Sequence, residues 1–166
     1  MLKTIIFARH AESTWDNPDW TDLTRPLTPR GFQDAAKMAA HLLHHAARPE
    51  IVLHSPAQRT TTTATFYAKV FGLAEKAQIA IENIYEAQPN TLWHIVQNLD
   101  NQYNTVLIVG HNPAMAYLLH DCGKEDFYAD LPPCGVFQVR FAVDNWQAAM
   151  PQTAFLEHIF VAGSLQ

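Results

Sequence analysis

Cysteine is almost absent from this 166-residue chain, which contains only Cys122 and Cys134. Neither residue belongs to a Cys-x-x-Cys pair. Two free, buried thiols in a reducing cytosol are the simplest interpretation, and a single disulfide between them stays open.

Positively charged residues are also few. Eleven lysines and arginines stand against 16 acidic residues, the formal net charge is −5, and no basic run exceeds two residues. This balance argues against a general nucleic-acid-binding protein, so we expect no nucleic-acid partner. Because the arginines are so few, their positions matter more than their number.

Long hydrophobic runs are missing as well. Five residues separate Lys3 from Arg9, which is too short for a signal-peptide core, and no segment approaches transmembrane length. We therefore expect a cytoplasmic protein without membrane contact. With 48% hydrophobic and 16% charged residues, the composition is typical of a globular protein, and the length favours one domain over residues 1–166.

Short apolar runs alternate with helical patterns through most of the chain. The runs predict strands at residues 2–8, 51–54, 79–82 and 105–109. Apolar periodicity and turn residues predict helices at residues 28–47, 55–71, 91–99 and 112–122. Such alternation is typical of a largely parallel sheet covered on both faces.

The pattern changes after residue 130. Residues 136–143 alternate as in a half-exposed strand, Asp144-Asn145 suggests a turn, and residues 153–161 predict a last strand. We expect these two strands to extend one edge of the sheet in antiparallel fashion. The predicted fold is an α/β, three-layer α/β/α sandwich with a mostly parallel sheet and an antiparallel edge.

Three of the predicted helices begin with a capping residue followed by proline, namely Thr28-Pro29, Ser55-Pro56 and Asn112-Pro113. Ser55 and Gln58 also have capping-box spacing, and Thr91 is the expected cap of the remaining helix. We expect the three proline-marked helices to point free N–H groups toward one rim of the sheet.

Three histidines share the polar face of the helix predicted at 28–47: His41, His44 and His45. At this spacing they could hold a metal ion. A solvated polar face is the interpretation that we favour.

Side chains suited to anion chemistry follow the carboxyl ends of the predicted parallel strands. Arg9 and His10 follow the first strand, Arg59 follows the second, Glu86 the third and His111 the fourth. In open α/β sheets these ends form a common rim where ligands bind. Two histidines with two or three arginines make a pocket for a doubly charged tetrahedral anion.

The same positions carry a resemblance to a known family. Arg9-His10-Ala11, with Ser13 and Trp15, resembles the Arg-His-Gly/Ala signature of the histidine phosphatase superfamily, which has a phosphoglycerate-mutase-like fold. Further matching motifs follow in the family's order: Arg25-Pro26-Leu27-Thr28 with Gly31, Ser55-Pro56-x-x-Arg59-Thr60, Tyr85-Glu86-Ala87 and Gly110-His111-Asn112-Pro113. The resemblance spans about residues 4–143, and its details resemble the small phosphohistidine phosphatase branch.

The resemblance implies a role for each of these residues. His10 would attack phosphorus and carry the phosphoryl group, while Glu86 would give a proton to the leaving group. The phosphate-binding residues would be Arg9, Arg25, Arg59, a protonated His111, and Asn112. Because fixed cations would stabilise the transferred group, we expect no metal and no cofactor.

Chain length bears on the substrate. Only 24 residues separate Glu86 from His111, which leaves little room for an inserted cap over the site. An open site favours a phosphorylated protein as partner, including a phosphohistidine domain. A small phosphomonoester, and a phosphoprotein-binding module without turnover, remain alternatives.

A zinc nucleobase deaminase is the rival reaction class. His10-Ala11-Glu12 and Pro133-Cys134 resemble part of the His-x-Glu…Pro-Cys-x-x-Cys pattern of those enzymes. The second cysteine would fall at position 137, which is Phe137, and Arg59 and His111 would have no role. The phosphatase interpretation therefore accounts for more of the sequence.

Overall fold

The computed structural model describes residues 2–123 and 130–165 and contains a six-stranded sheet in the order β3-β2-β4-β1-β5-β6. Its strands are β1 (Lys3–Arg9), β2 (Ile51–His54), β3 (Gln78–Ala80), β4 (Thr105–Gly110), β5 (Val136–Phe141) and β6 (Ala154–Phe160). The first four are parallel, whereas β5 pairs antiparallel with β1, and β6 pairs antiparallel with β5. The predicted antiparallel edge is confirmed.

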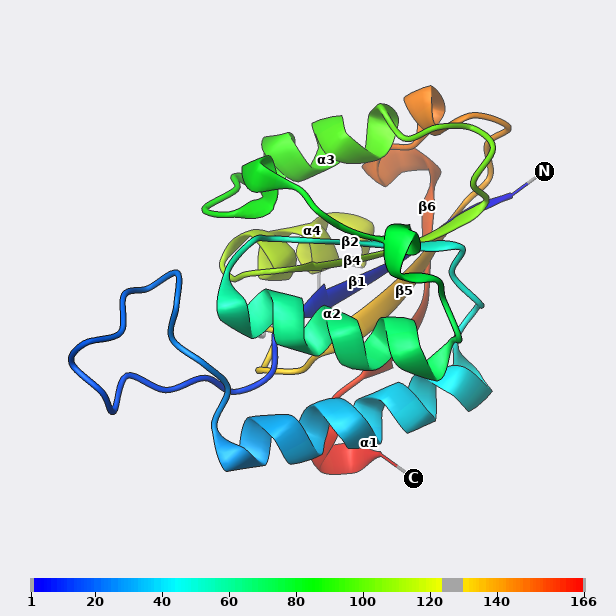
Figure 1. Ribbon diagram of the computed structural model, residues 1–166. Helices are drawn as coiled ribbons and strands as arrows, with labels where there is room; N and C mark the ends of the chain where they lie inside the picture. The colour runs from blue at the N-terminus through cyan, green and yellow to red at the C-terminus, as the bar shows by residue number, and fades with distance from the viewer. Residues whose placement is uncertain (1, 124–129, 166) are drawn as a thin grey trace.

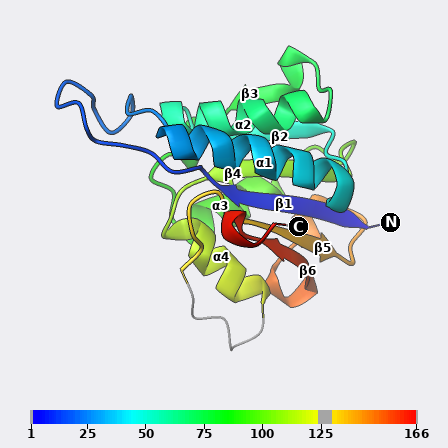
Figure 2. The ribbon, with the colours of Figure 1, turned by 90° about the horizontal axis from the view of Figure 1, so that it is seen from below.

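Helices cover both faces of the sheet (Figure 1). On one side lie α1 (Pro29–His45) and α2 (Gln58–Val70), and on the other lie α3 (Pro89–Gln97) and α4 (Ala114–Cys122). The view turned by 90° shows the same three layers (Figure 2). The predicted α/β/α sandwich is therefore confirmed.

Alternate residues of β1 divide between two apolar cores. Ile6 and Ala8 belong to the core under α1 and α2, whereas Ile5 and Phe7 belong to the core under α3 and α4. All four side chains are fully buried. Burial of a side chain as large as isoleucine or phenylalanine stabilises a fold by about 1.5–3 kcal/mol, so β1 is fixed from both sides. This rigid strand ends at the site described below.

The expected half-exposed character of β5 is wrong. Val136 and Gln138 are buried, and within β5 only Arg140 is exposed. The buried Gln138 amide has hydrogen-bond partners, because its Oε1 accepts a hydrogen bond from Ala47 N (2.8 Å) and its Nε2 donates to Glu157 (2.7 Å). The polar residue in the alternating pattern thus pairs with protein groups rather than with water.

One of the predicted proline-marked caps is confirmed. Thr28 caps α1, and its Oγ1 accepts a hydrogen bond from Gly31 N at 2.9 Å. Ser55 does not cap α2, which begins three residues later, at Gln58. Ser55 Oγ instead accepts from Ala57 N (3.2 Å) and contacts His111 (2.8 Å), so this hydroxyl belongs to the site.

Two other predicted helix starts are displaced. α3 begins at Pro89, before the expected cap Thr91. α4 begins at Ala114, with Pro113 at the capping position rather than inside the helix. Asn112 still contributes to this turn, because its Oδ1 accepts from Ala116 N at 3.2 Å.

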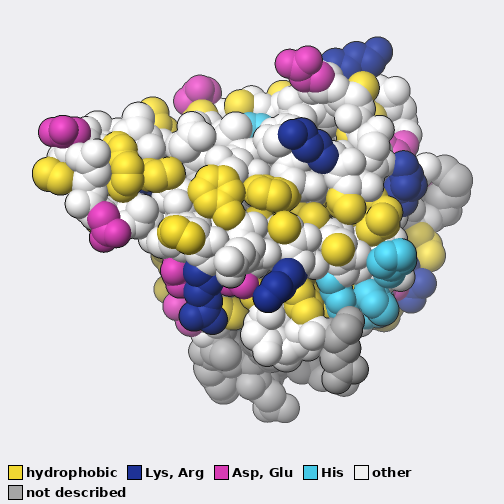
Figure 3. Space-filling view, turned by 60° about the horizontal axis from the view of Figure 1, so that its bottom comes forward, with side chains coloured by type: hydrophobic (Ala, Val, Ile, Leu, Met, Phe, Trp, Pro, Cys, Tyr) yellow, Lys and Arg dark blue, Asp and Glu magenta, His cyan; other side chains and the backbone are white. Residues whose placement is uncertain are grey.

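The histidines of α1 are not all solvated. His44 and His45 are exposed, but His41 is half-buried and packs its ring against His45 (centroids 4.2 Å apart) and Phe160 of β6 (4.6 Å). Figure 3 shows histidine side chains together at one end of this side of the molecule, beside a band of hydrophobic side chains. Among the described residues, no three His, Cys, Asp or Glu side chains are grouped to hold a metal ion.

Both cysteines, Cys122 and Cys134, are buried free thiols, as the sequence led us to expect. Burial raises the pKa of the Cys122 thiol to about 12 and that of the Cys134 thiol to about 11. Within residues 2–123 and 130–165, no helix has the length and apolar character needed to cross a membrane.

Candidate active site

A cavity of about 470 Å³ opens where the parallel strands end. Its walls include residues that follow β2, β3 and β4 and the long segment between β1 and α1, which projects from the body of the molecule (Figure 1). The lining side chains used below are Arg9, His10, Ser13, Asp22, Arg25, Arg59, Tyr85, Glu86, His111 and Asn112. Every residue predicted for the site from sequence therefore lies at one cavity.

His10 is buried at the base of this cavity, with only 6% of its surface exposed. Its Nδ1 lies 2.7 Å from the Ala11 carbonyl oxygen. Because a carbonyl oxygen only accepts, Nδ1 carries the proton and Nε2 keeps its lone pair. The pKa of His10 is lowered to about 3, mainly by burial and in addition by the charges of His111, Arg59 and Arg9, while the bond to the Ala11 carbonyl opposes this shift. His10 is therefore a neutral, oriented nitrogen base at neutral pH.

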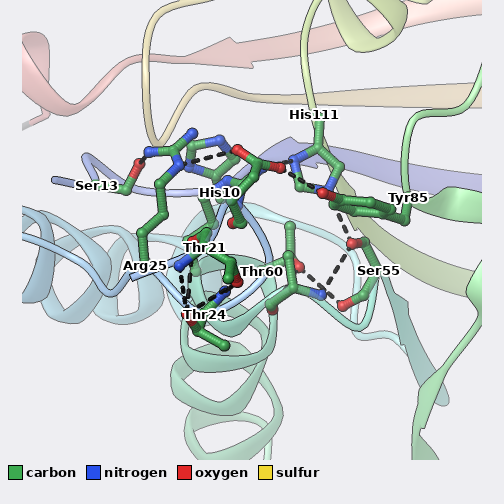
Figure 4. A network of polar contacts seen from close by, with 12 residues as sticks. His10, Ser13, Thr21, Thr24, Arg25, Ser55, Thr60, Tyr85 and His111 are labelled. Carbon is green, nitrogen blue, oxygen red and sulfur yellow. Dashed lines mark hydrogen bonds and ion pairs between the residues drawn. The ribbon is translucent and has the colours of Figure 1, made fainter. Parts of the chain in front are cut away.

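His111 lies beside His10, with ring centroids 5.4 Å apart. Its Nδ1 is 3.3 Å from Arg59 Nη2 and its Nε2 is 2.8 Å from Ser55 Oγ. Because arginine can only donate, Nδ1 accepts, and Nε2 carries the proton toward Ser55. Figure 4 shows His10 and His111 converging on the same space, with Ser55 below His111.

Without a bound anion, His111 is neutral at neutral pH, so the expected protonated form would require the phosphoryl group. Burial and, second, the charge of Arg59 lower the pKa of His111 to about 4. Asp22 raises the same pKa but does not outweigh these effects. His111 therefore orients Arg59 as a hydrogen-bond acceptor.

Asp22 connects the cationic side chains of the cavity. Its carboxylate accepts hydrogen bonds from Arg59 Nη2 (3.2 Å), Arg25 Nε (3.1 Å) and the Tyr85 hydroxyl (2.5 Å). Partial burial raises the pKa of Asp22, but the bonds from Tyr85, Arg25 and Arg59 dominate and lower it to about 2. A permanent carboxylate thus fixes two guanidinium groups at the mouth of the cavity.

Arg25 and Arg59 are held on several sides. Arg59 is 4% exposed and also donates to the Asp22 carbonyl oxygen. Arg25 donates to Ser13 Oγ and stacks on the Trp15 ring at 4.8 Å. Burial lowers the pKa of Arg59, but a guanidinium group stays charged in proteins. Both side chains are rigid cations that face the same anion-sized space.

Arg9 and Asn112 also line the cavity. Arg9 Nη1 donates to the Leu131 carbonyl (2.8 Å), and its Nε has no hydrogen-bond partner among the described residues. Asn112 Nδ2 donates to Asp130 Oδ1 and to the Leu131 carbonyl, both at 2.8 Å. Both amide hydrogens of Asn112 are therefore used to hold residues 130–131, which leaves none to donate to an anion.

Glu86 lies exposed at the rim, in a turn whose backbone is unusual. Its φ of 56° is in the left-handed region, which costs a non-glycine residue about 1–3 kcal/mol. Ile84 is buried before the turn, and the Tyr85 hydroxyl is bound to Asp22. The two neighbours thus hold Glu86 where its carboxylate lines the cavity.

The connecting role of Asp22 is not visible in the sequence. Three aspartates occur between His10 and Arg25, and nothing in the sequence distinguishes Asp22 from Asp16 and Asp19. Tyr85 was part of a recognised motif, but its bond to Asp22 depends on a contact across 63 positions. Only the folded chain shows these pairings.

These features define a class of protein: an α/β protein with a cationic, anion-sized pocket and a neutral imidazole at the carboxyl edge of its sheet. The sequence model of the histidine phosphatase superfamily (branch 1) matches residues 5–86. An uncharacterized protein of Mycobacterium tuberculosis is 32% identical over 158 residues, which are 89% of this chain and 95% of that protein. The chain belongs to the histidine phosphatase superfamily.

A second relative is longer than this chain. It is an uncharacterized chloroplastic protein of Arabidopsis thaliana that is 33% identical over 118 residues, or 66% of this chain. The chain spans only 54% of that protein's length.

Solved structures show the same fold. The Agrobacterium tumefaciens protein named as the phosphohistidine phosphatase SixA has a TM-score of 0.80 at 23% identity, over 96% of this chain and 97% of that one. The protein histidine phosphatase SixA in complex with tungstate has a TM-score of 0.79 at 19% identity, over 98% and 99%. A phosphoglycerate mutase from Plasmodium falciparum has a TM-score of 0.64 at 18% identity, over 98% and 92%. The predicted phosphoglycerate-mutase-like fold is confirmed.

Proposed function

We propose that this chain is a phosphatase that works through a phosphoryl group carried on Nε2 of His10 and acts on phosphohistidine in a protein. The arrangement of His10 carries the proposal. The bond from Nδ1 to the Ala11 carbonyl (2.7 Å) leaves Nε2 unprotonated inside a cavity that also contains Arg9, Arg25 and Arg59. A nitrogen nucleophile and fixed cations are what phosphoryl transfer requires of a protein.

In the first step, the lone pair of His10 Nε2 forms a bond to phosphorus. The bond from phosphorus to the leaving atom breaks, and its electron pair stays on that atom, which takes a proton from Glu86. Arg9, Arg25 and Arg59 bind the equatorial oxygens. A dianion beside Arg59 and His111 would also favour the imidazolium form of His111.

In the second step, water attacks phosphorus and gives a proton to the Glu86 carboxylate. The electron pair of the N–P bond returns to His10, inorganic phosphate leaves, and both residues regain their starting protonation. The three guanidinium groups supply the charge that a metal ion would otherwise provide, so we propose that the reaction needs no metal. Full activity in a chelating buffer is the expected result.

The preference for a protein substrate is supported by the chain between Glu86 and His111. Most of this segment forms α3 and β4, and the cavity remains open at its mouth. The tungstate complex of SixA shows that a protein of this fold accepts a tetrahedral oxyanion. We also propose a cytoplasmic location, because the free thiols Cys122 and Cys134 suit a reducing compartment.

Substitution of His10 tests the proposal. A phosphohistidine peptide labelled with ³²P should give the wild-type protein an acid-labile, base-stable label, and His10→Ala should abolish both label and turnover. Arg59→Ala should keep the label but slow its formation and weaken phosphate binding. Near-normal turnover in His10→Ala would overturn the mechanism.

A substrate panel separates the alternatives. Phosphohistidine peptide should be hydrolysed faster than phosphoserine peptide, phosphotyrosine peptide or sugar phosphates. Preference for a sugar phosphate would instead indicate a small-molecule phosphomonoesterase. Binding of phosphopeptide without release of phosphate would indicate a binding module.

A further inference from the structure

A second, smaller cavity adjoins the 470 Å³ cavity that contains His10 and the three arginines, which we term the phosphate pocket. It measures about 270 Å³ and shares Glu86, His111 and Asn112 with the larger cavity, so these residues form the wall between the two. Nothing in the proposed hydrolysis so far uses this space. Because it touches Glu86, it lies on the side where the proposed proton donor meets the leaving group.

The remaining walls are mostly apolar and firmly held. They come from the turn before α3 and from the start of α4, with Ile84 and Leu92 each 1% exposed and Ala114 4% exposed. Asn112 is fixed by its bonds to Asp130 and Leu131. The cavity is therefore preformed, as small-molecule and side-chain pockets usually are.

The charge of the second cavity differs from that of the first. The described residues that line it include no lysine or arginine, whereas three arginines line the phosphate pocket. A carboxylate or second phosphate placed here would lose water, gain no counterion and face Glu86. Such a group would be disfavoured, because it would be desolvated without a cation to compensate it.

The geometry of an in-line displacement places the leaving group in the second cavity. In-line displacement puts the leaving atom on the side of phosphorus opposite the attacking nitrogen. His10 lines only the larger cavity, while Glu86 lines both. The group attached to the leaving atom therefore extends past Glu86 into the second cavity.

We propose that this second cavity, which we term the leaving-group pocket, binds the uncharged ring that carries the phosphoryl group, as in the imidazole of a phosphohistidine side chain. This inference rests on the proposed phosphatase function. Its volume of about 270 Å³ is sufficient for one side-chain ring. The pocket thus selects against substrates with a second anionic group and in favour of a phosphorylated ring.

Two substitutions at the wall test the inference without touching the proposed chemistry. Ala87→Leu fills the pocket and should raise KM for phosphohistidine peptide and for para-nitrophenyl phosphate roughly tenfold. The competitive inhibition constant of inorganic phosphate should stay within about twofold, because phosphate occupies only the larger cavity. Ala74→Leu, at an exposed position outside both cavities, is the matched control and should change neither value.

Gln88→Lys is a second test that remains available if Ala87→Leu does not fold. Gln88 is exposed, so its substitution should leave the fold intact. The new cation should lower KM for 3-phosphoglycerate roughly tenfold relative to that for phosphohistidine peptide. Gln152→Lys, which is also exposed but remote, should leave this ratio unchanged. An unchanged KM in Ala87→Leu together with an unchanged ratio in Gln88→Lys would overturn the leaving-group pocket. Absence of hydrolysis by the wild-type protein would instead overturn the proposed function itself.

Discussion

Asp22 illustrates, at the scale of single residues, how an anion-binding site is ordered by an internal anion. The carboxylate lies 3.2 Å from Arg59 and 3.1 Å from Arg25, so it orients both guanidinium groups and also screens their charge. A substrate phosphoryl group would meet the same two cations. Orientation and screening act in opposite directions on phosphate binding, and substitution can separate them.

Asp22→Asn removes the charge and keeps a side chain of the same shape. We expect the inhibition constant of inorganic phosphate to fall roughly threefold to tenfold, because a charge that competes for Arg25 and Arg59 is lost. The turnover number should decrease, since the guanidinium groups are less well oriented. Inhibition and turnover assays measure both values. Asp19→Asn, on the same segment and exposed, should behave like the wild type, and weaker phosphate binding by Asp22→Asn would contradict the screening argument.

Glu86 allows a second prediction at this scale. Glu86→Gln keeps the shape of the side chain but removes the proton, so the effect should depend on the leaving group. We expect turnover of a phosphoserine peptide to fall about 100-fold, because an alkoxide leaves poorly without an acid. Turnover of a phosphohistidine peptide should fall less than tenfold, since its leaving group needs less assistance. Equal losses on the two substrates would show that Glu86 acts on the site rather than on the leaving group.

At the scale of secondary-structure elements, the start of α1 supports the segment that follows β1. A Cβ atom on Gly31 would lie 2.1 Å from the Glu12 carbonyl oxygen, so the helix and this segment touch at the backbone. Thr28 joins the same contact, because its hydroxyl donates to the Glu12 carboxylate at 2.8 Å. Glu12 lies two residues after His10. A displacement of α1 would therefore also displace the segment that carries His10, the proposed nucleophile.

Gly31→Ala should disturb both stability and activity. Because the new methyl group meets backbone rather than a flexible side chain, we expect the free energy of unfolding to fall by about 2–4 kcal/mol. Turnover should fall as well, since the segment carrying His10 must move. Urea unfolding and steady-state kinetics measure the two effects. Gly163→Ala, where nothing lies within 4 Å of the added Cβ, should be neutral in both assays.

The sequence predicted the elements better than their starts. Strands such as β4 were predictable because buried strands of a parallel sheet need continuous apolar side chains. Ser55-Pro56 had the composition of a helix cap, but the hydroxyl is used by His111, a contact across 56 positions. β5 was misjudged because its polar Gln138 pairs with Ala47 and Glu157 instead of water. Local patterns thus predicted local structure and failed where distant residues compete for the same polar group.

The candidate site followed the same rule. His10, Arg59 and His111 could be placed together because strand ends in a parallel sheet share one edge. The neutral state of His111 could not be predicted from sequence, since its pKa depends on burial and on Arg59. Asn112 was expected to bind phosphate, yet its amide hydrogens are bound by Asp130 and Leu131. The catalytic roles and the single domain over residues 1–166 stay predictions.

At the scale of the whole molecule, buried histidines link folding to pH. Burial lowers the pKa of His10 to about 3 and of His111 to about 4, and it also lowers the pKa of His54. In the unfolded chain these groups titrate near 6.5. Between the folded and unfolded pKa values, the unfolded chain binds more protons than the folded protein. Stability from the neutral histidines is therefore complete above about pH 6.5 and is lost as the pH falls toward the folded pKa values.

The contribution of His10 to this loss can be isolated. For a folded pKa of about 3, protonation of the unfolded chain at pH 5 should cost about 2 kcal/mol of stability relative to pH 8. His10→Asn removes the titrating group, so its free energy of unfolding should fall by about 2 kcal/mol less than that of the wild type over the same interval. Urea unfolding at pH 8, 6 and 5 measures both proteins, and comparing each with itself cancels any loss of packing from the substitution. Equal losses in the two proteins would mean that His10 binds a proton as readily in the fold as in the unfolded chain. In that case Nε2 would not be the neutral nucleophile that the proposed mechanism needs.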